Sequence, residues 1–155
     1  MATEIERKFL VRNSSFLTAL SGQVLRQGYL SHSTQATVRV RIAGDQGFLT
    51  IKGQNNGISR AEFEYPIPLD DAEALLALCQ SRRIDKTRYR IPVDQHLWEV
   101  DVFAGDNAGL IVAEIELGDE TETFTRPDWL GNEVSDDPRY FNSQLSQHPY
   151  CQWRD

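Results

Sequence analysis

Charged residues alternate at the start of the chain. Residues 4–8 read EIERK, which places Glu4, Glu6 and Lys8 at i, i+2 spacing. Because successive side chains of a β-strand point to opposite faces, these three charges share one face of the strand that this segment predicts. Two carboxylates suit a hard metal ion, and an ammonium group suits a phosphate. One charged strand face is usually just a solvated surface, so its meaning depends on the rest of the chain.

The same alternation recurs along most of the chain. Period-2 patterns, separated in several places by turns rich in Gly, Asp and Asn, predict eight strands. We expect them at residues 4–11, 24–31, 37–43, 47–53, 60–67, 85–92, 96–103 and 110–118. Seven of the eight have one charged and one largely apolar face, and most charged faces carry a single sign. A surface selected only for solubility mixes the two signs, so we interpret the charged faces as one shared interior.

These strands predict a mainly β (α+β) fold, a closed eight-stranded antiparallel barrel whose lumen is charged. Eight strands enclose room for one small ligand. The apolar outer faces need cover, which we assign to a few helices packed outside the barrel. The sequence predicts helices at residues 13–20, at 70–80 with Asp70 as the N-cap, and in pieces across 127–147 that Pro138 interrupts.

Strand parity assigns eight acids and seven bases to the lumen. They are Glu4, Glu6, Lys8, Arg39, Arg41, Lys52, Glu62, Glu64, Lys86, Arg88, Arg90, Glu99, Asp101, Glu114 and Glu116. Arg90 is left open, because the nearby Pro92 can end or bend the strand. So many charges require partners, water, metal ions or a charged ligand.

The lumen residues predict phosphate chemistry. Carboxylates bind Mg²⁺ or Mn²⁺, and no Cys/His cluster offers a zinc site. Clustered Arg and Lys bind phosphate oxygens, and six or seven bases suit a linear triphosphate. In phosphoryl transfer, positioning and charge neutralisation supply most of the catalysis. No GxxxxGK[ST] loop occurs, so side chains have to form the site.

The motifs resemble those of the CYTH family, the triphosphate tunnel metalloenzymes. EIERK at 4–8 is similar to the ExExK signature of that family. The resemblance continues through QGYL at 27–30, TVRVR at 37–41, TIKG at 50–53, KTRY at 86–89, WEVDVF at 98–103 and AEIEL at 113–117. It implies a closed eight-stranded tunnel and an enzyme that acts on a triphosphate with Mg²⁺ or Mn²⁺.

The resemblance also implies roles for individual residues. The implied metal ligands are Glu4, Glu6, Glu114 and Glu116. Glu99 and Asp101 are implied as further ligands or supporting groups. Glu62 and Glu64 are implied to hold a second metal or to orient water. The triphosphate-binding residues are Lys8, Arg39, Arg41, Lys52, Lys86 and Arg88. Tyr29 is a catalytic residue together with Lys8, whose ammonium group favours the phenolate. On spacing alone, Tyr29 is equally a core residue. A helix of the C-terminal segment closes one tunnel end, which we treat as structural.

Hydrolysis of inorganic tripolyphosphate to diphosphate and phosphate is the leading hypothesis, because a purely charged lumen recognises the triphosphate and little else. Three alternatives stay open: hydrolysis of thiamine triphosphate or a nucleotide, cyclisation of ATP as in class IV adenylate cyclases, and non-catalytic polyphosphate binding. A net charge of −7 argues against nucleic-acid binding.

Length and composition predict one domain over residues 1–155. No apolar run approaches the ~20 residues of a membrane span. Cys79 and Cys151 match no metal or disulfide spacing, which favours the cytoplasm. The expected partner is a small-molecule triphosphate, and the oligomeric state is open between monomer and homodimer.

Overall fold

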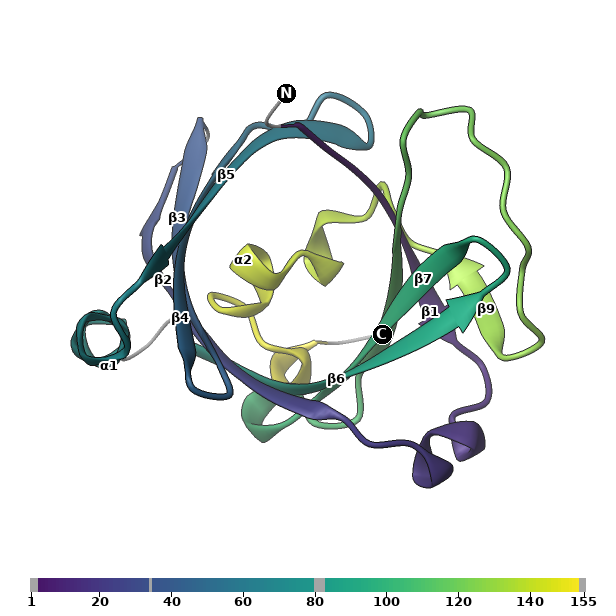
Figure 1. The fold of residues 1–155 in the computed structure, drawn as a ribbon, viewed down its shortest axis with the longest axis horizontal. Helices are drawn as coiled ribbons and strands as arrows, with labels where there is room; N and C mark the ends of the chain where they lie inside the picture. The colour runs from purple at the N-terminus through teal and green to yellow at the C-terminus, as the bar shows by residue number, and fades with distance from the viewer. Residues whose placement is uncertain (1–2, 34, 80–82, 154–155) are drawn as a thin grey trace.

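The computed structural model describes residues 3–33, 35–79 and 83–153. Within these residues the fold is built from nine antiparallel strands. The strands are β1 (Thr3–Val11), β2 (Gln23–His32), β3 (Ala36–Ala43), β4 (Gln46–Gly53), β5 (Ser59–Ile67), β6 (Arg83–Val93), β7 (His96–Phe103), β8 (Ile111–Glu116) and β9 (Leu130–Glu133). Their order is β5-β4-β3-β2-β6-β7-β8-β1-β9, and an additional pairing of β5 with β1 closes β1–β8 into a ring (Figure 1). The predicted eight-stranded antiparallel barrel is confirmed, with β9 as an extra strand beside β1.

The register of the strands sets opposite charges side by side inside the ring. Lys8 of β1 pairs with Glu114 of β8, and Lys52 of β4 pairs with Glu62 of β5. A slip of one residue would turn every one of these side chains to the outer face. The β3–β4 connection is tight, and its Gly44 has a φ of 64°, a left-handed conformation that glycine adopts without steric cost.

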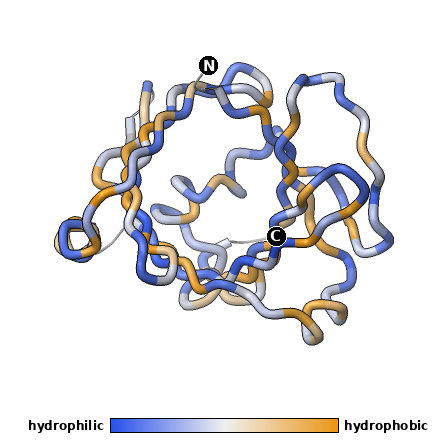
Figure 2. The backbone as a smooth tube through the Cα atoms, in the orientation of Figure 1, coloured by the Kyte–Doolittle hydropathy of each residue, from blue (hydrophilic) through white to orange (hydrophobic). Residues whose placement is uncertain are grey.

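Two hydrophobic clusters lie outside the ring, as the apolar strand faces predict, and a third, which includes Ile84, Phe103 and Leu145, lies on the lumen-facing side of the strands. Along the strands hydrophilic and hydrophobic residues alternate (Figure 2). On the β1–β7–β8 side, Phe9, Trp98 and Phe124 meet edge to face, with ring centroids 5.6–6.0 Å apart. Such contacts add about 0.5–1.5 kcal/mol per pair beyond the burial of apolar area. A second cluster joins Ala72 and Leu76 to the outer face of β3.

The helix of that second cluster, α1 (Leu69–Ala77), packs against β2, β3 and β4. The prediction of Asp70 as its N-cap is wrong. The cap is Pro68, which offers no side-chain hydrogen bond, and Asp70 and Asp71 lie in the first turn. Carboxylates there still interact favourably with the helix dipole. The predicted end of this helix, residue 80, lies outside the described residues.

The remaining helical segments are short. The segment predicted at 13–20 is the 3₁₀ helix η1 (Ser15–Ala19), and η2 (Gly105–Asn107) precedes β8. The C-terminal segment contains β9, η3 (Pro138–Tyr140), α2 (Asn142–Leu145) and η4 (Tyr150–Gln152). Unlike α1, α2 does not lie on the outer surface: it lies at one opening of the ring (Figure 1), and its first residues line the lumen. Within the described parts of the chain, no helix combines the length and apolar character that crossing a membrane requires.

Candidate active site

The charged faces of β1–β8 surround a cavity of about 250 Å³ inside the ring. All residues that the sequence predicts for the site line this cavity, except Asp101. Arg90, which the sequence left open, lines it as well. Strand β6 continues through Pro92 to Val93, so the proline does not end the strand. Strand parity therefore identified most of the lining residues.

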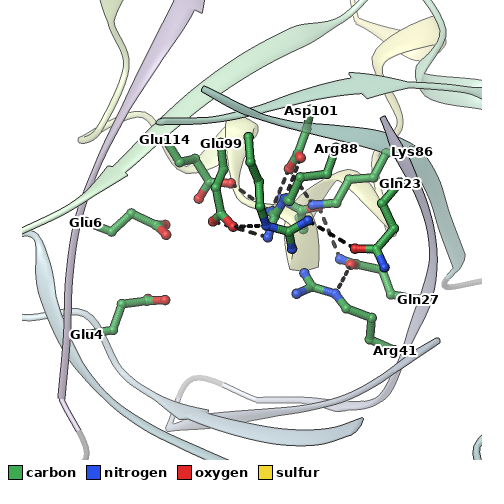
Figure 3. Close-up of polar contacts among 12 residues, drawn as sticks. Glu4, Glu6, Gln23, Gln27, Arg41, Lys86, Arg88, Glu99, Asp101 and Glu114 are labelled. Atoms are coloured by element: carbon green, nitrogen blue, oxygen red, sulfur yellow. Dashed lines mark hydrogen bonds and ion pairs between the residues drawn. The ribbon is translucent and has the colours of Figure 1, made fainter. Parts of the chain in front are cut away.

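One side of the cavity is acidic and is formed by β1 and β8. Glu4 and Glu6 point into the lumen from this side, and Arg41 and Gln27 point inward from the other (Figure 3). Lys8 lies among the acids: its Nζ is 2.7 Å from Glu114 Oε2 and 3.0 Å from Glu6 Oε1. The carboxylates are thus brought together around an ammonium group.

The acidic side holds more negative charge than its cations balance. Burial and the neighbouring carboxylates of Glu114 and Glu4 raise the pKa of Glu6 to about 8, although Lys8 acts in the opposite direction. Burial also acts to raise the pKa of Glu114, but Lys8 and a hydrogen bond from Glu6 keep that pKa well below its ordinary value. Glu6 therefore carries a proton at neutral pH when no other cation is present.

Glu4 occupies a different environment on the same strand. Its Oε1 is 3.1 Å from Lys52 Nζ, and its Oε2 accepts a hydrogen bond of 2.9 Å from Arg60 Nε. Although burial raises the pKa of Glu4, these two cations lower it to about 2. Glu116, in contrast, is exposed and forms no ion pair with any described residue. Partial burial of its side chain and the negative charges of Glu4 and Glu62 raise the pKa of Glu116.

One buried carboxylate contacts two cations of the basic side. Asp101 of β7 is 1% exposed and lies beneath the cavity lining. It accepts two hydrogen bonds from Arg88, at 2.8 and 2.9 Å, and its Oδ2 is 2.7 Å from Lys86 Nζ. Burial opposes the ionised form, but these two cations lower the pKa of Asp101. Asp101 is thus engaged by cations and supports the basic wall.

Two arginines of β3 complete that wall, and neither forms an ion pair shorter than 3.5 Å with a described carboxylate. Arg41 Nε donates to Gln27 Oε1 at 2.8 Å and has no ion-pair partner among the described residues. Burial and the nearby Arg39 and Arg88 lower the pKa of Arg41 to about 9. Arg39 Nη2 donates to Thr50 Oγ1 at 3.2 Å and lies 3.5 Å from Glu64 Oε2, and its buried Nε has no hydrogen-bond partner among the described residues. Guanidinium groups that lack a close carboxylate partner are suited to binding an anionic ligand.

Tyr29 is 5% exposed and both lines the cavity and belongs to a hydrophobic cluster with Ile84 and Phe103. The two interpretations of its sequence position, core and site, are therefore compatible. No hydrogen bond between Tyr29 and Lys8 occurs within the described residues, since Lys8 Nζ donates to carboxylates. The two side chains share the cavity without direct contact.

Sequence reasoning missed several residues of the site. Arg60 lines the cavity beside Glu4, and its parity with Glu62 in the same predicted strand was a usable signal. Three residues of the C-terminal segment also line the cavity: Phe141, Asn142 and Ser143. No periodic pattern marks them, and they reach the lumen only through the path of the folded chain.

The acidic side fits a divalent metal ion by the chemistry of its donors. Its carboxylate oxygens are the ligands that Mg²⁺ and Mn²⁺ prefer, and a cation would neutralise the repulsion that keeps Glu6 protonated. Among residues 3–33, 35–79 and 83–153, however, no three acidic, His or Cys side chains are already arranged as a metal site. Of the carboxylates that would hold such an ion, Glu6 and Glu114 contact the ammonium group of Lys8.

Comparison with known proteins agrees with this architecture. The chain is 46% identical over 156 residues to an inorganic triphosphatase of Acetivibrio thermocellus, covering 100% of both proteins. It is 41% identical over 150 residues to an inorganic triphosphatase of Nitrosomonas europaea, covering 93% of this chain and 97% of that one. A crystal structure described as the inorganic triphosphatase NE1496 matches with a TM-score of 0.65 at 35% identity, over 92% of this chain and 96% of the other. The CYTH domain model matches residues 2–146, and the chain therefore belongs to the CYTH domain family.

Proposed function

We propose that this chain is an inorganic triphosphatase that hydrolyses tripolyphosphate to diphosphate and phosphate, with a divalent metal ion. The lumen's composition carries the proposal. Of the described residues that line the cavity, most are acidic or basic, and only Tyr29 and Phe141 are aromatic. Such a cavity offers many contacts to phosphate oxygens and little surface for a nucleobase or a thiazole ring. Full-length similarity to two inorganic triphosphatases supports the same activity.

The basic side is proposed to bind the triphosphate. Arg39 and Arg41 have guanidinium nitrogens free of carboxylates or only weakly engaged, so they can bind phosphate oxygens without first breaking a short ion pair. Arg88 is held rigidly by Asp101, which fixes the direction of its remaining donors. We include Lys8, Lys52 and Lys86 in the same binding surface, since all three line the cavity.

The acidic side is proposed to hold the metal through Glu4, Glu6, Glu114 and Glu116, which β1 and β8 bring to one wall. When bound, Mg²⁺ or Mn²⁺ supplies charge neutralisation at phosphate oxygens. Glu62 and Glu64 lie on β5, where Glu62 is 3.4 Å from Lys52 and Glu64 accepts a 3.0 Å hydrogen bond from Thr50. They are proposed to orient water or a second cation, and Glu99, beside Arg88, to support the first site.

Tyr29 is proposed to accept the proton of the attacking water, with Lys8 as a second catalytic residue. The observation that supports this role is that the buried Tyr29 and Lys8 both line the cavity. Lys8 is in addition a substrate-binding residue once its carboxylates bind a metal.

The experiment that tests this function is product analysis. Purified protein with tripolyphosphate and Mg²⁺, or Mn²⁺ in a parallel sample, is expected to release diphosphate and phosphate in equal amounts. Chelation by EDTA is expected to stop the reaction. Tight binding of tripolyphosphate without any product would instead favour a polyphosphate-binding module. We further predict a cytoplasmic location, and the choices between Mg²⁺ and Mn²⁺ and between monomer and homodimer are left as alternatives.

A further inference from the structure

Asn142, the first residue of α2, connects the C-terminal segment to the basic wall of the lumen. Its Oδ1 accepts a hydrogen bond of 2.9 Å from Lys86 Nζ and one of 3.2 Å from Gln27 Nε2. Both donors are buried, Gln27 at 0% and Lys86 at 2% exposure. Asn142 itself lines the cavity. The contact therefore lies between the end wall of the lumen and its cationic side.

The two donors fix the orientation of the Asn142 amide. An ammonium group can only donate, so the atom facing Lys86 is the carbonyl oxygen Oδ1. The amide nitrogen Nδ2 then points elsewhere, and it has no acceptor among the described residues. Asn142 thus presents two oriented hydrogen-bond donors beside a cavity that the proposed substrate enters.

A neutral amide here adds no negative charge beside Arg41 or beside Lys86, whose ammonium group is already paired with Asp101. Gln27 Oε1 accepts from Arg41 Nε at 2.8 Å, so amide groups link Arg41, Gln27, Asn142 and Lys86 in one chain of hydrogen bonds. Gln27 and Arg41 point toward one another in Figure 3. An amide satisfies buried donors without cancelling their charge, whereas a carboxylate cancels it. This end of the lumen therefore combines Arg41, which has no ion-pair partner among the described residues, with a free donor, which is a binding surface for an anion.

We propose that Asn142 is a substrate-binding residue whose Nδ2 donates to a terminal phosphoryl group of the triphosphate, with Lys86 and Gln27 as positioning residues that orient the amide. The inference rests on the proposed function and specifies which residues receive one end of the substrate. It assigns a binding role to the C-terminal segment, which otherwise only closes the tunnel.

The substitution Asn142→Asp separates this role from a structural one. The aspartate keeps an oxygen for Lys86 and Gln27, so the segment stays attached and the melting temperature is expected to equal or exceed that of the parent protein. Its second oxygen replaces the Nδ2 donor with a negative charge that faces the phosphate. We expect the KM for tripolyphosphate and its Kd, measured by calorimetry without metal, to rise roughly a hundredfold. Asn142→Ala loses the donor without adding charge, and a rise of about tenfold is expected.

Ser146→Ala is the matched control. Ser146 belongs to the same segment, and its hydroxyl donates to the Ser143 carbonyl oxygen at 2.7 Å without touching Lys86 or the cavity. This variant is expected to lower the melting temperature and to leave KM and Kd unchanged. If Asn142→Asp binds and cleaves tripolyphosphate like the parent protein, the inference is wrong while the proposed function stands. If the parent protein itself releases no phosphate, the proposed function fails, and metal-free Kd values still decide whether Asn142 binds the anion.

Discussion

Lys86 Nζ and Asp101 Oδ2 lie 2.7 Å apart, and each side chain is only 1% exposed. Lys86 lines the lumen and Asp101 lies beneath that lining, where Arg88 binds the same carboxylate. Taking such charges out of water is costly, and the cost is offset only when the partners are complete. This cluster therefore ties the position of two cavity-lining cations to a single buried acid.

Asp101→Asn is expected to lower the free energy of unfolding by about 3–5 kcal/mol, because it leaves buried cations without their counter-charge. Urea denaturation measures the loss. Glu99→Gln is the matched control on the same strand: its carboxylate is 31% exposed and lies 3.3 Å from Arg88, so a loss below about 1 kcal/mol is expected. Equal losses in the two variants would contradict the importance of burial.

Metal binding is expected to release a proton from Glu6. Its pKa of about 8 means that the side chain is protonated at neutral pH in the metal-free protein, while a ligating carboxylate must be ionised. The affinity for Mn²⁺ should therefore rise by up to about tenfold per pH unit toward pH 8 and level off above it. Calorimetry in two buffers of different ionisation enthalpy measures the released proton. An affinity that is constant from pH 6.5 to 8.5 would contradict this assignment.

Glu6→Gln is expected to stabilise the metal-free protein while removing metal-dependent activity. Between the ordinary pKa near 4.5 and the folded value near 8, the folded state retains a proton that the unfolded chain has lost. The free energy of unfolding therefore falls as pH rises through this window, and it does so less in the variant. Melting temperatures at pH 5 and pH 8.5 test this, with a larger gain expected at pH 8.5. Glu73→Gln, at an exposed ion pair with Arg26, should show no such growing gain.

Glu116 and Glu4 are both proposed metal ligands, but substituting them is expected to have different effects on the fold. Glu116 is exposed and has no ion-pair partner among described residues, so Glu116→Ala should lose metal-dependent activity with an unchanged melting temperature. Glu4→Ala should lose activity and also stability, because Lys52 and Arg60 lose their shared carboxylate. Steady-state assays and thermal melts on both variants test this pair. Normal turnover in either variant would overturn the metal assignment for that residue.

Tyr29→Phe is expected to lower kcat by about 100-fold or more and to leave KM unchanged, since a general base acts in the reaction and contributes little to ground-state binding. The ring keeps its packing against Ile84 and Phe103, so stability should be retained. An unchanged kcat would show that Tyr29 is not a catalytic residue and has only a structural role.

The strands and the inward-facing residues were predictable from the sequence, because the side-chain period of a strand is two and register fixes the face. The strand predicted at residues 37–43, for example, corresponds to β3 at Ala36–Ala43, and its Arg39 and Arg41 line the lumen. Asp101 shows the limit of parity. It has the correct face but lies beneath the long side chains of Lys86 and Arg88, and depth cannot be read from alternation.

The C-terminal contribution to the site was not predictable. Asn142 belongs to an α-helix of four residues, and such a segment carries too few turns for a recognisable hydrophobic period. Strand β9, also four residues long, reads LGNE and lacks alternation, so only its pairing with β1 reveals it. Tertiary contacts, and not local patterns, place both segments.

A competition between substrates tests the central claim most directly. With Mg²⁺ or Mn²⁺, phosphate release is measured from tripolyphosphate, thiamine triphosphate and ATP at equal concentrations, and cyclic AMP is assayed in the ATP sample. A charged lumen that recognises only the triphosphate predicts a far higher kcat/KM for tripolyphosphate than for either organic substrate, with no cyclic AMP. A preference for thiamine triphosphate or ATP, or formation of cyclic AMP, would contradict the account by showing that the protein recognises an organic group.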